Sequence, residues 1–123
     1  MKIPAFVSFA LLAAPAVAQH HWIDPGSGDF DDPGNWNTGL VPGYWSEAYF
    51  DLPGAAAYDV AFHAPTHVAD VFVRYSDVDF LLNGNELQLE QAYRPLIVLD
   101  STTTSWPTLT IRDGRVLVDG PVY

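Results

Sequence analysis

The sequence predicts an all-β fold, a right-handed parallel β-helix of a few coils that follows an irregular N-terminal cap. Three observations lead to this prediction. Apolar residues recur two positions apart in short segments from Ala48 onward, which is the spacing of one face of a strand. Similar segments then recur further along the chain. Helix signals are nearly absent, and the single candidate, residues 86–93, fits a strand and a turn better.

Residues 1–18 have the features of a signal peptide. Lys2 precedes an apolar run that is too short to span a bilayer, and Ala16-Val17-Ala18 is a small-x-small cleavage site. We therefore expect export, cleavage after Ala18 and a location that is secreted, extracellular or at the cell surface. No second long apolar run follows, so we expect no membrane insertion after cleavage.

Residues 19–46 form the predicted cap, which is rich in Trp, Asp and Gly. Asp-Pro-Gly occurs at 24–26 and again at 32–34, and this tripeptide is a strong turn signal. We expect an irregular segment here, with at most short strands.

Residues 47–123 contain the predicted coils, each built from three short strands. The apolar pairs of two successive coils are Val71/Val73, Phe80/Leu82, Leu87/Leu89 and then Leu96/Val98, Leu109/Ile111, Val116/Val118. One constant shift maps the second and third pairs of the first set onto those of the second, so that Phe80 corresponds to Leu109 and Leu87 to Val116. An earlier and looser copy consists of Ala48, Phe50, Tyr58, Val60 and Phe62.

A coil of this kind cannot bury its apolar face alone, so neighbouring coils must stack and bury their faces together. The chain stops at Tyr123, inside or just after a coil, which predicts a segment truncated at its C-terminus. Further coils of the same chain or self-association are then the expected neighbours of the last coil. A β-sandwich is the alternative fold, because it also uses short alternating strands at turn spacing.

The composition limits the possible partners. Fifteen acidic residues face five basic ones, and the formal net charge is −10 at pH 7. Such an acidic surface repels nucleic acid and anionic lipid, so neither is an expected partner. The chain has no cysteine, so its core must come from sheet packing without disulfides.

Several motifs resemble the opening of bacterial secreted right-handed β-helix proteins of the PEP-CTERM and autotransporter-associated β-repeat type. These motifs are Trp22, the turn-rich run 28–36 with its Asn-Trp pair, Val-Pro-Gly at 41–43, Ala-Tyr-Phe at 48–50 and the Leu-Thr-Ile-turn-Gly segment within 107–114. The resemblance implies an extracellular, repetitive and non-catalytic scaffold. It carries no catalytic residues that could be transferred to this chain.

Oxygen ligands crowd one loop of the cap: Asp24, Asp29, Asp31, Asp32 and Asn35. Ca²⁺ takes six to eight oxygen ligands, so this loop is a candidate calcium site. The same residue types also form Asx turns and capping contacts, which we prefer as the interpretation because the EF-hand spacing breaks off after the first ligands.

Four tryptophans are candidates for carbohydrate stacking or for the core. Trp45, its neighbour Tyr44, and Trp106 are the candidate glycan-binding residues, whereas Trp22 and Trp36 are expected to close the N-terminal end of the core. Extracellular polysaccharide or other surface components are therefore the expected partners.

The chain lacks any Ser-His-Asp order, phosphate loop or dinucleotide fingerprint, and no catalytic residue is assigned. After cleavage, His20 and His21 near the new N-terminus offer Cu²⁺ ligands, and His63 and His67 flank a turn. We interpret the chain as a secreted, non-catalytic structural or adhesion-type module. A carbohydrate-binding module is the alternative, and a polysaccharide-active enzyme is a more distant one.

Overall fold

The computed structural model describes residues 18–90, 97–100 and 106–118. The predicted signal peptide lies outside these residues, except for Ala18. The described residues form eleven β-strands and one short 3-10 helix, with no α-helix among them. The predicted all-β class is thereby confirmed. No helix in the described part of the chain is long and apolar enough to cross a membrane.

The strands and the helix have the following bounds, in chain order: β1 (Ala18–His21), β2 (Gly28–Asp29), η1 (Pro33–Asn35), β3 (Ser46–Phe50), β4 (Tyr58–Ala61), β5 (Thr66–Val68), β6 (Asp70–Arg74), β7 (Val78–Leu81), β8 (Glu86–Leu89), β9 (Ile97–Asp100), β10 (Leu109–Arg112) and β11 (Arg115–Val118).

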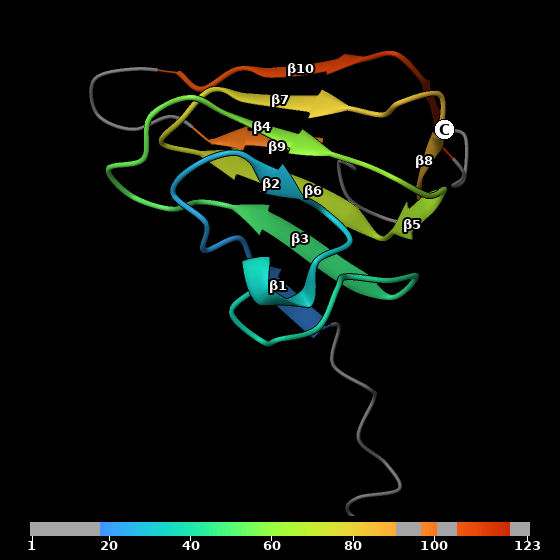
Figure 1. The fold of residues 1–123 in the computed structure, drawn as a ribbon, viewed down its shortest axis with the longest axis horizontal. Helices are drawn as coiled ribbons and strands as arrows, with labels where there is room; N and C mark the ends of the chain where they lie inside the picture. The colour runs from blue at the N-terminus through green and yellow to red at the C-terminus, as the bar shows by residue number, and fades with distance from the viewer. Residues whose placement is uncertain (1–17, 91–96, 101–105, 119–123) are drawn as a thin grey trace, which may run out of the picture.

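The strands form three sheets, and every strand pair is parallel (Figure 1). The first sheet has the order β1-β3-β6-β9, the second has β2-β4-β7-β10, and the third has β5-β8-β11. Consecutive strands therefore enter different sheets, and three strands in succession make one round, as β3, β4 and β5 do. The alternative of a sandwich with antiparallel sheets is not what the described residues form, since their one antiparallel contact is the isolated bridge between Trp22 and Trp36.

Inward-facing residues of successive rounds stack in register and make the core. Ala48 pairs with Val71 in the first sheet, and Val60 pairs with Phe80 in the second. These four residues are at most 1% exposed. Burying a side chain as large as Val or Phe stabilises the fold by about 1.5–3 kcal/mol each. The period-two pattern thus identified the inward faces of β3, β4, β6 and β7, including those of the looser first copy.

The N-terminal end of the core is closed by aromatic rings. Trp22, Phe30 and Trp36 are each 1% exposed, and the Trp22 and Trp36 rings meet edge to face with centroids 5.3 Å apart. Each indole N–H also donates to a backbone carbonyl, Trp22 to Asp24 at 2.8 Å and Trp36 to Phe30 at 2.9 Å. Both tryptophans are core residues, as expected from the sequence. The cap also contributes β1 and β2, which pair with β3 and β4.

Two predicted correspondences between the repeats are wrong. The register aligns Phe80 with Ile111, whereas the sequence pattern aligned Phe80 with Leu109 and Leu82 with Ile111. The predicted pairs of Leu87 with Val116 and Leu89 with Val118 are confirmed. The difference arises between the strands, because residues 82–85 connect β7 to β8 while residues 113–114 alone connect β10 to β11. One constant shift cannot describe two rounds whose connections differ in length.

A second correction concerns β9. The register aligns Ile97 with Val71 and Leu99 with Val73. The sequence pattern had assigned Leu96 and Val98 to these positions, one residue earlier. Leu96 lies outside the described residues. The predicted register of β9 is therefore wrong by one residue.

Candidate functional site

Tyr44 and Trp45 form an exposed aromatic pair at the tip of a turn. The turn closes where the backbone N–H of Ser46 donates to the carbonyl of Gly43 at 2.9 Å, just before β3 begins. Tyr44 is 41% exposed and Trp45 is 70% exposed. Their ring centroids lie 4.5 Å apart at an interplanar angle of 74°, so one ring presents its edge to the other.

His67 and Glu90 extend this pair into a mixed aromatic and polar surface. His67 lies on β5 beside the inward Val68, and its ring contacts the Tyr44 ring at a centroid distance of 4.2 Å. His67 Nε2 lies 2.7 Å from Glu90 Oε2. Glu90 is held in place because its backbone N–H donates to the carbonyl of Val68 at 3.0 Å. We name Tyr44, Trp45, His67 and Glu90 the corner patch.

Trp106, the third candidate glycan-binding residue, lies elsewhere. It is 73% exposed and precedes β10 in the second sheet, whereas Trp45 precedes β3 in the first. Within the described residues, no aromatic ring packs against it. The structure therefore joins Tyr44 to Trp45 but does not join Trp106 to them.

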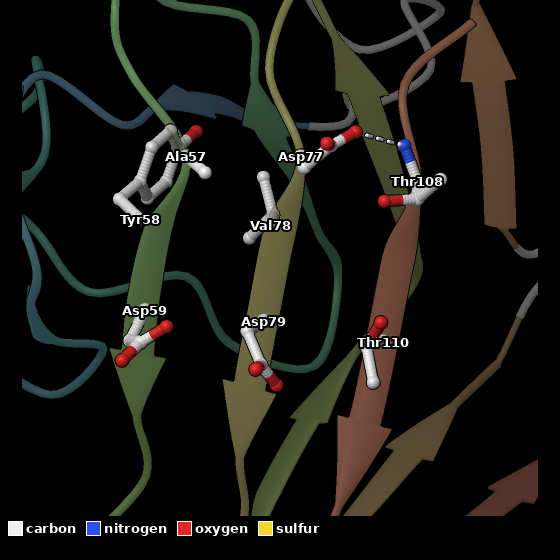
Figure 2. A pocket seen from close by; sticks show the side chains of 8 residues that line it. All are labelled: Ala57, Tyr58, Asp59, Asp77, Val78, Asp79, Thr108 and Thr110. Atoms are coloured by element: carbon white, nitrogen blue, oxygen red, sulfur yellow. Dashed lines mark hydrogen bonds between the residues drawn. The ribbon is translucent and has the colours of Figure 1, made fainter.

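An acidic groove lies on the outer face of the second sheet. Figure 2 shows Asp59, Asp79 and Thr110 in a row across β4, β7 and β10, and the register places these three residues directly opposite one another. The groove has a volume of about 190 Å³. Asp77 lies at one end of it and accepts a hydrogen bond of 2.9 Å from the backbone N–H of Thr108.

Arg112 partly neutralises the groove. Its Nε donates to Asp79 Oδ1 at 3.0 Å. This hydrogen bond and the charge of Asp79 raise the pKa of the guanidinium, and the charges of Asp59 and Asp113 add to the effect. The carboxylates of Asp59 and Asp79 repel each other across the strands, and Arg112 offsets that repulsion. The groove therefore consists of cross-strand contacts between rounds. Asp59, Asp77 and Asp79 all line it, but they are not grouped so that they could hold a metal ion, and no such group is found in the described part of the chain.

The candidate calcium loop is organised by Asx turns. Asp24 Oδ1 accepts from the backbone N–H of Gly26, and Asp32 Oδ1 accepts from that of Gly34, each at 2.9 Å. Asp32 is also the N-cap of η1. Asn35 uses its amide to donate to the carbonyl of Asp29 at 2.9 Å. These contacts match the preferred interpretation of the loop as turns and capping contacts.

The remaining candidate ligands of the loop, Asp29 and Asp31, reach across to His63. Asp29 Oδ1 lies 2.9 Å from His63 Nε2, and Asp31 accepts from the backbone N–H of His63 at 3.0 Å. Among the described residues, no three His, Asp or Glu side chains are grouped so that they could hold a metal ion. His63 contacts the carboxylate of Asp29, whereas His67 contacts that of Glu90.

The two histidines near the predicted cleavage site both form contacts within the fold. His20 is 4% exposed, and its ring nitrogens lie 2.6 Å from the Thr38 hydroxyl and 3.2 Å from the Ser46 hydroxyl. Burial, and then the charge of His21, lower the pKa of His20. His21 Nδ1 lies 3.0 Å from both carboxylate oxygens of Asp51. Copper binding at either ring nitrogen of His20, or at Nδ1 of His21, would displace these partners.

Sequence reasoning missed two buried carboxylates. Glu47 and Asp70 are 2% and 0% exposed and lie side by side in the register of β3 and β6. Glu47 Oε1 accepts from Gln19 at 3.3 Å and from the Tyr49 hydroxyl at 3.2 Å. Strand parity places both on the outer face, where the pattern predicts exposure. Only their surroundings in the fold make them buried.

Burial also raises the pKa of the Tyr58 hydroxyl, with a smaller contribution from the charge of Asp51. Tyr58 is 3% exposed and its ring stacks on that of Trp22 at a centroid distance of 6.2 Å, so this tyrosine is part of the core.

Comparison of the chain with protein-family models, curated proteins and solved structures finds no match.

Proposed function

We propose that this chain is a secreted, non-catalytic structural or adhesion-type module of the bacterial cell surface or extracellular matrix, built from coils of a right-handed parallel β-helix. One observation carries the proposal. Successive rounds of three strands stack in parallel register in all three sheets, so that the second round pairs with the first and the third with the second. A module of this kind extends by adding rounds.

The topology supports the helical arrangement. Each strand leaves its sheet and its parallel neighbour arrives one round later, after the chain has passed through the other two sheets. Connections between parallel strands of one sheet are right-handed in about 98% of cases, which is the reason for proposing this hand.

The polar contacts support a structural role. Arg112 with Asp79, Arg115 with Glu86 and His67 with Glu90 each join residues of neighbouring rounds. These charged and imidazole side chains thus link successive rounds. Exposed pairs of this type contribute about 0–1 kcal/mol each, so most of the stability comes from the stacked apolar core.

Nuclear magnetic resonance of the purified protein tests the fold. We expect amide contacts between Val60 and Phe80 and between Phe80 and Ile111, because parallel neighbours lie about 4.8 Å apart. Close Hα–Hα contacts of antiparallel pairs at these positions would contradict the β-helix.

Localisation tests the role. The full chain with a C-terminal tag is produced in a Gram-negative host, and Ala18→Arg serves as the control that blocks cleavage. We expect the wild-type N-terminus at Gln19 by mass spectrometry and a tag that accumulates outside the cell or in the matrix fraction. An uncleaved chain that stays in the cytoplasm would overturn the proposed role.

A further inference from the structure

The corner patch combines open aromatic surface with fixed polar groups. Trp45 is 70% exposed, and its ring meets the Tyr44 ring at 74°, so the two rings are not stacked and much of the indole surface stays open to a flat ligand. A pyranose ring has a face of C–H groups that packs on an aromatic ring, and hydroxyl groups around its edge that need hydrogen-bonding partners.

Polar partners lie where those hydroxyl groups would reach. His67 contacts the Tyr44 ring, and its Nε2 lies 2.7 Å from Glu90 Oε2. Both side chains are partly exposed, Glu90 at 29% and His67 at 27%. Gln88 lies opposite His67 in the register of β5 and β8, so its amide belongs to the same outer face. The surface therefore offers donors and acceptors beside an aromatic face, which is the combination found in sites that orient a polar ligand.

Charge selects among the saccharides. The chain carries a formal net charge of −10, and Glu90 lies in the patch itself, so an anionic polysaccharide would be repelled. A cation over an exposed aromatic ring gains only about 0.5–1 kcal/mol, so the 70% exposed Trp45 adds little to the general attraction between a cationic polymer and this acidic chain. The open indole face fits the flat side of a neutral sugar.

We propose that the corner patch, together with Gln88, is a binding site for neutral polysaccharide. Trp45 provides the stacking platform, Tyr44 holds it and adds apolar contact, and the Glu90 carboxylate, positioned by the buried Nε2 of His67, binds sugar hydroxyls together with Gln88. This site adds a ligand to the structural role proposed above and does not depend on it.

Affinity electrophoresis of the purified protein in gels that contain hydroxyethyl cellulose tests the proposal, with alginate and chitosan gels run in parallel. We expect retardation by the neutral polymer and an affinity about tenfold lower in Trp45→Ala, a loss that corresponds to one stacked ring. Trp45→Phe keeps an aromatic face and is expected to recover part of the binding.

Trp106→Ala is the matched control, because Trp106 is as exposed as Trp45, at 73%, but lies outside the patch. Its retardation is expected to equal that of the wild type. An absence of retardation by the neutral polymer, an equal loss in Trp106→Ala, or retardation by chitosan or alginate alone would each overturn the proposal. Since Trp45 is a surface residue, circular dichroism is expected to give the same spectrum for all variants.

Discussion

Inward-facing residues of the stacked rounds differ in how completely they are buried. Leu82 and Leu89 are 0% exposed, whereas Val116 is half-buried and Val118 is 64% exposed. The reason is position, because β11 is the last strand of its sheet and has a described neighbour on one side alone. The same apolar residue type therefore contributes unequally to stability.

Leu82→Asp is expected to unfold the protein at room temperature, because it places an unpaired charge in a fully buried position. Val116→Asp is expected to lower the free energy of unfolding by a smaller amount, since its side chain keeps access to water. Urea titration followed by circular dichroism measures both, and Leu40→Asp, at a 64% exposed position, is the neutral control. Equal losses in the two core variants would show that the end of the core is as closed as its centre.

His20 makes stability depend on pH. Its pKa is lowered from 6.5 by burial, so the unfolded chain takes up this proton at a higher pH than the folded protein does. The contribution of His20 is therefore complete above pH 6.5 and is lost as the pH falls from there toward the lower pKa of the folded state.

We expect His20→Gln to reduce the loss of stability between about pH 7.5 and pH 5 relative to the wild type. Urea unfolding at both pH values measures the difference. His63→Gln is the control, since the His63 side chain is 57% exposed. If His20→Gln and the wild type lose stability in parallel, burial of the neutral imidazole is not the cause.

At the scale of the elements, the connections between strands decide how successive rounds fit. The connection from β7 to β8 uses Asn83 and Gly84 with positive φ angles of 53° and 84°, and the Asn83 and Asn85 amides both donate to the carbonyl of Phe62 in the round before. The shorter connection from β10 to β11 passes directly over Leu82. Gly114 makes this close approach possible.

Gly114→Ala is expected to destabilise the last round. A Cβ at this position would lie 2.4 Å from both the carbonyl oxygen of Asn85 and Cβ of Leu82, so backbone must move. We expect a loss of about 1–3 kcal/mol, the usual cost of forced overpacking, measured by thermal unfolding. Gly43→Ala is the matched control, because nothing lies within 4 Å of its added Cβ. An unchanged melting temperature in Gly114→Ala would mean that β10 and β11 pack differently.

At the scale of the whole molecule, the two ends of the stack differ. Aromatic rings close the end near β1 and β2, where Phe30 also stacks on Phe62 at 4.7 Å. At the other end, β9, β10 and β11 are the last strands of the three sheets among the described residues. The core is thus sealed on one side by Trp22 and Trp36, while Trp45 and Trp106 lie on the surface.

This division of the four tryptophans predicts the fluorescence of the protein. In the double variant Trp45→Phe and Trp106→Phe, the emission comes from Trp22 and Trp36, which are each 1% exposed. We expect that emission to be shifted to shorter wavelength and protected from quenching by iodide. In the reverse variant, Trp22→Phe and Trp36→Phe, the emission of the folded fraction should be quenched readily. Ready quenching of the first variant would place its tryptophans at the surface and contradict the closed end.

The sequence by itself determined the strands and the direction of most of their side chains. Val71, Phe80 and Leu87 were assigned to inward faces from a period of two, which is a property of a single strand and needs no knowledge of its neighbours. The Asp-rich loop was likewise interpreted as Asx turns, because those contacts are made between residues two positions apart. Tyr44 and Trp45 were selected as candidate glycan-binding residues because they are adjacent in the sequence.

Only the tertiary structure decided which residues of neighbouring rounds lie opposite each other. It aligned Phe80 with Ile111, buried Glu47 on an outer face and brought Glu90 to His67 beside Tyr44. These outcomes depend on the lengths of the connections and on segments from different rounds. A contact between rounds is fixed by the register of whole strands, and a change of two residues in one connection moves it without changing the pattern of any strand.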